Sequence, residues 1–231
     1  MKASIRQISE MTGFSQSTVS NALNNKKGVN PETARKIIET ARECGYQMQK
    51  RVDGIRLAIF KSGGQIVADT PFFSALIEGV ESEGRKAGHE ITLFNLDNRQ
   101  PDYMQKLQSL LNDPSYAILL LATEMTENDI RPFQQCEAPL VLLDAWFEKY
   151  PFDTVLISNT DSVCQAVQYL LDCGHKNVGY LKGNVRIQNF KYREMGLHRA
   201  LQRNGKSLNS AFVYNLTPTM EGAQKDMSAL L

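Results

Sequence analysis

The chain has 231 residues, of which 42% are hydrophobic and 22% are charged, and its formal net charge is +1. This length suits about two domains, and the composition is typical of a packed globular protein rather than a disordered one. No apolar run approaches the roughly 20 residues that span a bilayer, and the N-terminus is polar where a signal peptide is apolar. We therefore expect a cytoplasmic protein that does not bind membranes.

The charged residues are unevenly distributed. Residues 1–51 hold nine lysines and arginines against four glutamates, a net of +5, so the remaining residues carry a net of −4. A basic N-terminal segment favours contact with a polyanion, although a solvated surface of the same charge is an open alternative. The four cysteines are scattered without ligand-type spacing, so we expect reduced thiols, no metal and no cofactor.

The spacing of apolar and capping residues predicts three short helices in the N-terminal segment. The first runs from Ser4 to about Met11, the second covers about residues 15–23, and the third lies between Asn30 and Gly45. The second helix is rich in Ser, Thr, Gln and Asn, and a glycine-containing turn separates it from the first. Two short helices joined in this way are the parts of a helix-turn-helix.

The polar residues of the second helix suggest two kinds of contact with DNA. Gln16, Ser17 and Asn21 project from one side, where their amides and hydroxyl can bond base edges in a major groove. The other hydroxyl residues would reach phosphates, namely Ser15, Thr18 and Ser20. A three-helix interaction module with a solvated polar helix explains the composition equally well.

From residue 56 onward, apolar β-prone runs alternate with amphipathic stretches, which is typical of a parallel sheet covered on both faces. Strands are predicted at 57–60, 91–96, 117–122, 140–143, 154–158, 178–181 and 211–214. Helices are predicted at about 73–87, 101–112, 126–136, 160–173, 189–204 and 218–230. The fold class is therefore α/β, with a small all-α head joined to a parallel-sheet body.

Residues 4–46 resemble the DNA-binding head of the LacI/GalR family of bacterial transcriptional regulators. The resemblance includes an S-x-x-T-V-S core that begins at Ser15, and it extends to Val29 and to Gly45-Tyr46. It implies that the head binds double-stranded operator DNA. The DNA-binding residues are then expected to be Ser4, Ser15, Gln16, Ser17, Thr18, Ser20, Asn21, Asn24 and Thr33.

The resemblance continues through the body, at residues 70–73, 139–144, 171–183 and 193–196. It implies a periplasmic-binding-protein-like fold, in which two α/β lobes clasp a small effector such as a sugar or a nucleobase. The expected effector residues are Phe72, Phe73, Asp144, Asn159 and Arg193, with Phe73 lining the cleft and Phe72 in the core. Structural roles remain open alternatives for the aromatic pair, for Asp144 and for Arg193.

The expected domains are the head at 1–46, a linker at 47–55, a first lobe at 56–158 and a partial second lobe at 159–231. The second lobe is expected to be incomplete because family members continue further. Asn21 stands where most members carry arginine, so a different base preference is expected. The family's N-x-x-A-R-x-L hinge is absent, and neither Val52 nor Ile55 is expected to replace its minor-groove wedge.

These features predict a transcriptional regulator, of repressor type, that binds DNA as a homodimer and responds to a small effector. A small-molecule sensor or interaction protein that has lost operator binding is the alternative. Catalysis is not expected, because no G-x-G-x-x-G follows the first strand and there is no P-loop. Ser62-Gly63-Gly64 alone is too weak a signal for a phosphate cradle.

Overall fold

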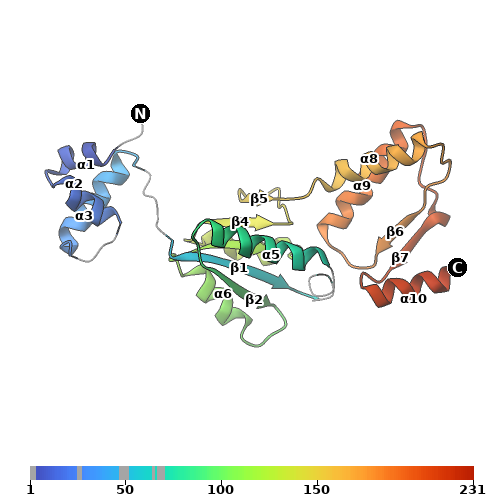
Figure 1. Ribbon diagram of the computed structural model, residues 1–231, viewed down its shortest axis with the longest axis horizontal. Coiled ribbons are helices and arrows are strands. Elements are labelled where there is room, and N and C mark those ends of the chain that lie inside the picture. The colour runs from blue at the N-terminus through green and yellow to red at the C-terminus, as the bar shows by residue number, and fades with distance from the viewer. Residues whose placement is uncertain (1–3, 25–27, 47–51, 64–65, 67–70) are drawn as a thin grey trace. The chain divides into compact units, whose positions relative to one another are not determined.

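The computed structural model describes residues 4–24, 28–46, 52–63, 66 and 71–231 (Figure 1). The chain divides into two compact units, Met1–Val52 and Asp53–Leu231. We call them the head and the body and describe each by itself. Residues 47–51 of the predicted linker lie outside the described residues.

The head contains the three predicted helices, α1 (Ile5–Thr12), α2 (Gln16–Leu23) and α3 (Pro31–Glu43). Each begins at a side chain that accepts a hydrogen bond from a backbone N–H of the first turn, which would otherwise lack a partner. The capping residues are Ser4, Ser15 and Asn30. Gly13 ends α1 with a φ of 77°, a left-handed conformation that glycine adopts without steric cost. Local sequence therefore specifies the bounds of these helices.

The core of the head is small and is formed by one side of each helix. Ile8, Val19, Ala22, Ile37 and Ala41 are each at most 4% exposed and pack together. Burial of a large aliphatic side chain stabilises a fold by about 1.5–3 kcal/mol, so this cluster supplies most of the apolar stabilisation of the head. The opposite sides of the helices remain exposed.

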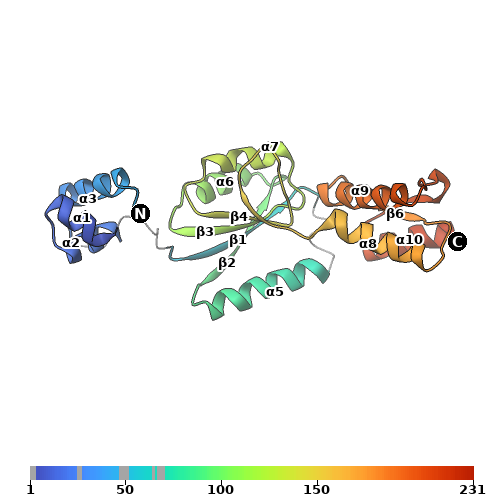
Figure 2. The ribbon, with the colours of Figure 1, turned by 90° about the horizontal axis from the view of Figure 1, so that it is seen from above.

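The body begins with a five-stranded parallel sheet in the order β2-β1-β3-β4-β5. Helix α5 covers one face, and α6 and α7 cover the other (Figure 2). The strands are β1 (Gly54–Lys61), β2 (Ile91–Asp97), β3 (Tyr116–Leu121), β4 (Leu140–Leu143) and β5 (Asp153–Val155). The helices are α5 (Pro71–Lys86), α6 (Tyr103–Leu111) and α7 (Glu127–Ile130).

Strand β1 shows why the sheet is buried on both sides. Ala58 and Phe60 pack in the cluster under α6, whereas Leu57 and Ile59 pack in the cluster under α5. Successive side chains of a strand point to opposite faces, so a continuous apolar run requires cover on both. The α/β body inferred from that pattern is confirmed.

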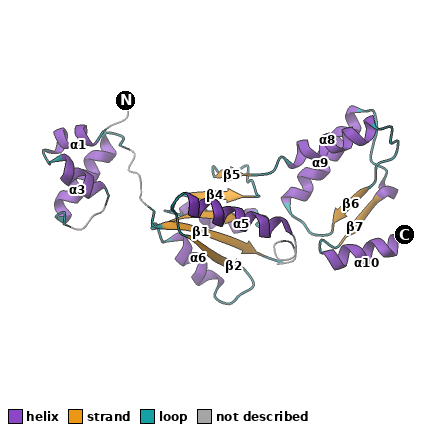
Figure 3. Ribbon diagram, viewed as in Figure 1, coloured by secondary structure: helices purple, strands orange, loops and turns teal. Residues whose placement is uncertain are grey.

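The remaining chain adds a second, two-stranded parallel sheet of β6 and β7 (Figure 3). Its elements are α8 (Asn159–Asp172), β6 (Tyr180–Gly183), α9 (Gln188–Arg203), the 3-10 helix η2 (Ser210–Phe212), β7 (Val213–Leu216) and α10 (Met220–Leu230). Helices α8 and α9 lie side by side in close contact. The backbones approach so closely that a Cβ at Gly196 would collide with the carbonyl of Thr160.

Three predicted elements differ from the structure. The helix predicted at 126–136 is instead α7 followed by a 3-10 helix, η1 (Arg131–Gln135), because Pro132 lacks the N–H that an α-helix needs. The strand predicted at 154–158 is shorter in the structure, where β5 covers Asp153–Val155. The first strand begins at Gly54, inside the predicted linker.

The early start of β1 changes the interpretation of Ile55. It pairs with Ile91 of β2 and Ala117 of β3, so it belongs to the sheet and not to a linker. Gly54 is also required there, because a Cβ at this position would lie 2.8 Å from the Glu90 carbonyl oxygen. A residue fixed in a central strand cannot act as a wedge in DNA, in agreement with the expectation for Ile55.

Candidate DNA-binding and effector sites

Helix α2 presents two of the predicted base-reading residues, Ser17 and Asn21, on the side opposite to its core contacts. Val19 and Ala22 are buried, and a helix places residues three or four apart on one side. Ser17 is exposed, Asn21, one turn further on, is half-buried, and Gln16 is exposed at the first position of the helix. In the part of the head that the structure describes, the amides of Gln16 and Asn21 make no hydrogen bond. These groups are available to an outside partner.

Two of the hydroxyl residues predicted to reach phosphates, Ser15 and Thr18, lie at the first turn of α2 beside Ser17, whereas Ser20 lies further along the helix. The Ser15 hydroxyl lies 2.8 Å from both the Ser17 and the Thr18 hydroxyl oxygens, and it accepts a hydrogen bond from the Thr18 N–H at 3.1 Å. A helix N-terminus with nearby hydroxyls attracts anions, because unpaired N–H groups and the helix dipole both favour negative charge. This end of α2 is suited to a backbone phosphate.

Two of the other predicted DNA contacts, Asn24 and Ser4, already have structural roles at helix ends. The Asn24 amide donates to the Ser20 carbonyl at 2.7 Å, at the C-terminal end of α2. Ser4 forms a capping box with Gln7 at the start of α1. Thr33 is half-buried in the first turn of α3. Capping alone explains Ser4, and DNA contact by these three residues stays a prediction.

Asp144 lies directly after β4, at the carboxyl end of the sheet, and is 7% exposed. Its φ is 59°, and this left-handed backbone is uncommon for a residue other than glycine. Its Oδ2 accepts a hydrogen bond from the Thr123 hydroxyl at 2.8 Å. Its Oδ1 is buried and has no hydrogen-bond partner within the described residues. The carboxylate therefore retains an acceptor for a donor from outside the chain.

Burial raises the pKa of Asp144, whereas the Thr123 hydrogen bond and the nearby Arg193 charge oppose the rise. A chain of amides links this residue to Arg193. The Asn189 amide donates to the Asp144 carbonyl oxygen at 3.0 Å, and the Asn159 amide donates to Asn189 Oδ1 at 3.2 Å. Arg193 Nε then donates to Asn159 Oδ1 at 2.7 Å. Three predicted effector residues, Asp144, Asn159 and Arg193, are thus in one network.

The two phenylalanines at the start of α5 are divided in the reverse of the expected way. Phe73 is 4% exposed and packs in the cluster with Leu57 and Ile59, whereas Phe72 is 42% exposed. Their rings meet edge to face, with centroids 5.0 Å apart. Phe73 points to the sheet because that face of α5 covers it, so Phe72 is the accessible aromatic group.

Sequence reasoning missed Thr123 and Asn189, which complete the network around Asp144. Asn189 lies four residues before Arg193, so both project from one side of α9. That spacing was a usable signal. Thr123 gave a weaker signal. Its only indication was its position after β3, at the same edge of the sheet as Asp144.

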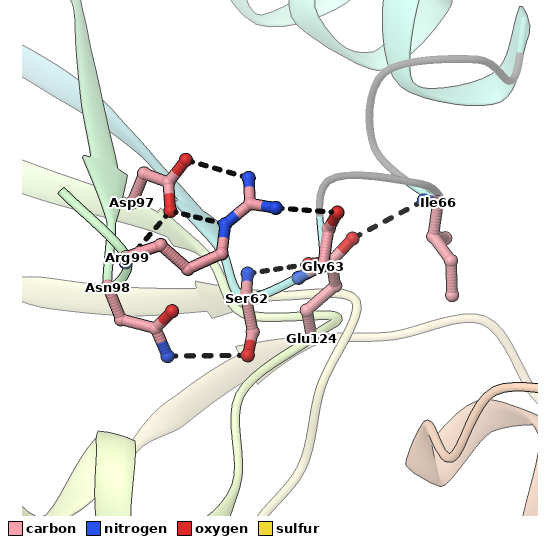
Figure 4. A network of polar contacts seen from close by, with 7 residues as sticks. All are labelled: Ser62, Gly63, Ile66, Asp97, Asn98, Arg99 and Glu124. Atoms are coloured by element: carbon pink, nitrogen blue, oxygen red, sulfur yellow. Dashed lines mark hydrogen bonds and ion pairs between the residues drawn. The ribbon is translucent and has the colours of Figure 1, made fainter.

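A second polar network, also missed, lies at the ends of β1, β2 and β3 (Figure 4). The Glu124 carboxylate accepts hydrogen bonds from the backbone N–H groups of Ser62, Gly63 and Ile66. Arg99 donates to the Gly63 carbonyl oxygen at 3.1 Å and forms a two-bond ion pair with Asp97. Hydrogen bonds from Arg99 hold the pKa of Asp97 well below its usual range.

No helix among the described residues is both long and apolar enough to cross a membrane. In the same residues, no group of three or more His, Cys, Asp or Glu side chains is placed to hold a metal ion.

Comparison with protein families gives two matches. Residues 4–49 match the family of bacterial regulatory proteins named lacI, and residues 58–231 match the family described as periplasmic binding proteins and sugar binding domain of LacI family. The chain is 24% identical over 229 residues to the HTH-type transcriptional regulator GalS of Salmonella typhimurium. It is 26% identical over 214 residues to the HTH-type transcriptional repressor PurR of Pasteurella multocida.

The alignments cover 98% of this chain and 67% of GalS, and 91% of this chain and 64% of PurR. The chain thus spans about two thirds of the length of these relatives. Among solved structures, it is similar to a complex of the transcriptional regulator CelR with cellobiose, with a TM-score of 0.63 and 21% identity. It is also similar to a lac repressor dimer bound to operator and the anti-inducer ONPF, with a TM-score of 0.60 and 18% identity.

Each of these two alignments covers 100% of this chain and 70% of the solved chain, and at such identities they show the fold. The helix-turn-helix head and the periplasmic-binding-protein-like body are therefore confirmed by both structure and family match. The chain belongs to the LacI family of bacterial transcriptional regulators.

Proposed function

We propose that this regulator represses transcription by binding operator DNA through α2, and that a small effector held by the body sets its affinity for DNA. The observation that carries the proposal is that the amides of Gln16, exposed at the start of α2, and of Asn21, on the side away from buried Val19 and Ala22, make no hydrogen bond within the described residues. A regulator of chromosomal genes acts in the cytoplasm, and its action requires no catalysis.

The amides provide the base readout in this proposal. An asparagine or glutamine amide can donate its N–H to adenine N7 and accept from the adenine N6 amino group through its oxygen, so it distinguishes adenine from guanine in the major groove. Ser15 and Thr18 provide hydroxyls at the start of the same helix, which suit phosphate contacts that fix its register. Asn21, a short amide in place of the arginine usual in the family, should favour a different base at its position.

Dimerisation follows from the small size of the head. One helix-turn-helix reads only a few base pairs, whereas two heads related by a dyad read both halves of a palindromic site. The similar lac repressor was solved as a dimer on its operator. We propose the same arrangement here, with the head at residues 1–46 and the effector held by the body.

The body supplies groups that suit a small ligand with several hydroxyl or amide groups. Asp144 Oδ1 is a buried acceptor with no partner in the described residues. The Arg193 guanidinium is a donor, and Asn159 and Asn189 connect it to the backbone carbonyl oxygen of Asp144. A ligand that donates to the carboxylate and accepts from the guanidinium would satisfy both. Sugars and nucleobases carry such groups, and the similar CelR was solved with cellobiose.

Selection of binding sites from a random duplex pool, followed by anisotropy titration, tests the DNA-binding part. We expect an enriched palindrome, affinity that falls steeply with salt, and at least about 1,000-fold weaker binding to unrelated duplex. Absence of any enriched sequence, together with thermal stabilisation of the chain by a sugar or nucleobase, would instead indicate a sensor that has lost operator binding.

A further inference from the structure

The loop after β1 presents backbone N–H groups that converge on one point. The N–H groups of Ser62 and Gly63 lie 2.7 and 2.9 Å from Glu124 Oε2, and the Ile66 N–H lies 3.4 Å from Oε1 (Figure 4). Convergent backbone N–H groups form a concave site that binds anions in many proteins. Here the anion is a side chain of the same molecule, supplied from the segment after β3, 62 residues further along the chain.

The shape of this loop is held by contacts that do not involve Glu124. Arg99 donates to the Gly63 carbonyl oxygen at 3.1 Å, and the Asn98 amide donates to the Ser62 hydroxyl at 3.3 Å. The Arg99 charge is balanced by Asp97, at 2.9 to 3.0 Å. Ser62 and Gly63 therefore keep these contacts when no carboxylate occupies their N–H groups.

The occupied loop borders a cavity of about 210 Å³. Ser62, Gly63, Ile66, Glu124 and Thr126 line one side, and Val185, Arg186 and Ile187, between β6 and α9, line the other. A ligand phosphate or carboxylate that entered here would find the converging donors engaged by Glu124. It would also meet the like charge of Glu124 at short range, with Arg186 on the opposite wall as the cationic group of the cavity. A neutral ligand meets neither obstacle.

We propose that Glu124 determines the charge of the effector: its carboxylate fills an anion site at the end of β1 and so excludes phosphorylated and carboxylate-bearing ligands from this end of the cavity. The inference rests on the proposed function in one respect, namely that the cavity serves effector binding. On this proposal, the N–H groups of Ser62 and Gly63 hold an internal carboxylate in place of a ligand phosphate.

Inorganic phosphate is a suitable probe, because its binding can be measured without knowledge of the effector. Isothermal titration calorimetry on the full chain compares the wild type with Glu124→Ala, which removes the internal anion, and Glu124→Gln, which keeps its size and removes its charge. Glu148→Ala is the matched control, since it removes the same charge from an exposed site without a hydrogen bond to the loop.

We expect no measurable phosphate binding to the wild type or to Glu148→Ala at about 10 mM, and a gain of at least about tenfold for Glu124→Ala, with Glu124→Gln between them. If Glu124→Ala does not melt cooperatively, Glu124→Gln alone decides. Failure of both folded variants to bind phosphate more tightly than the wild type would overturn the proposal, as would phosphate binding by the wild type with equal affinity.

The proposed effector function is tested separately by titrating the wild type with neutral probes, cellobiose and hypoxanthine among them. Gain of phosphate binding on removal of Glu124 does not depend on that result. A wild type that binds no sugar or nucleobase would therefore count against the effector function while leaving the anion site in place.

Discussion

The head and the body use polar side chains in opposite ways. In the head, the amides of Gln16 and Asn21 are left unpaired on a helix whose other side is buried, so their hydrogen-bonding capacity remains for a partner. In the body, Asp144, Asn159 and Asn189 are almost fully buried and bond to one another. Substitution in the head should therefore change recognition, whereas substitution in the body should change stability as well.

The largest effect is expected at Gly196, where α8 and α9 touch. A Cβ at this position would collide with the Thr160 carbonyl, so the two helices must separate. Gly196→Ala should lower the stability of the body by about 3 kcal/mol, the upper part of the usual range for overpacking. Chemical denaturation followed by circular dichroism measures this loss.

Gly79→Ala in α5 is the control for the glycine substitution, because nothing lies within 4 Å of a Cβ there. An alanine in an open helical site should stabilise the body by about 0.5–1 kcal/mol. Equal effects of the two substitutions would show that α8 and α9 do not depend on a close approach.

Asn189 comes next, because it joins the strained backbone of Asp144 to the amide of Asn159. Asn189→Ala leaves the Asp144 carbonyl oxygen without its amide donor and should cost about 2 kcal/mol of folding free energy. It should also loosen Arg193, which Asn159 orients. The exposed Gln202, on the same helix, provides the control, since Gln202→Ala should change stability by less than about 0.5 kcal/mol. Similar melting of both variants would contradict the role of the network.

Substitutions in the head should change DNA recognition and leave stability nearly unchanged. Gln16→Ala and Asn21→Ala should each weaken binding to the preferred duplex by about 1–2 kcal/mol and leave both non-specific binding and thermal stability nearly unchanged. Anisotropy titration against preferred and scrambled duplexes measures the difference. Thr40→Ala on α3 is a control for substitution elsewhere in the head. A uniform loss on both duplexes would mean that these amides contact phosphates and not bases.

The same contrast explains what could be predicted from the sequence. The bounds of α1 and α2 follow from local signals, since Ser15 caps and Gly13 stops a helix within a few residues. The two-sided burial of β1 follows from its own apolar run. Asn189 and Glu124 could not be found so readily, because their partners lie 45 and 62 residues away.

The burial of Phe73 and the exposure of Phe72 were predicted the wrong way round for a related reason. Their adjacency in sequence shows that they point in different directions, but only the position of α5 on the sheet decides which ring is covered. By contrast, Pro132 was a local signal that the α-helix ends near Ile130. The error at Phe72 and Phe73 thus comes from the packing of α5 on the sheet, whereas the error at 126–136 comes from a local signal that was not used.

The smallest effect, and the one that separates charge from hydrogen bonding in the body, is expected at Asp144. Burial raises the pKa of this carboxyl above its ordinary value, so the folded chain holds a proton more tightly than the unfolded chain does. The Asp144 contribution to stability therefore falls as pH rises from the unfolded pKa, near 3.9, through the raised folded value. Asp144→Asn removes the titration while its amide can still accept from Thr123. The variant should gain stability relative to the wild type at pH 7, and this gain should shrink toward pH 4, as read from paired denaturation curves. A gain that grew as the pH fell would mean that the folded state stabilises the Asp144 carboxylate, and the remaining acceptor on Oδ1 would then have a partner that favours its charge.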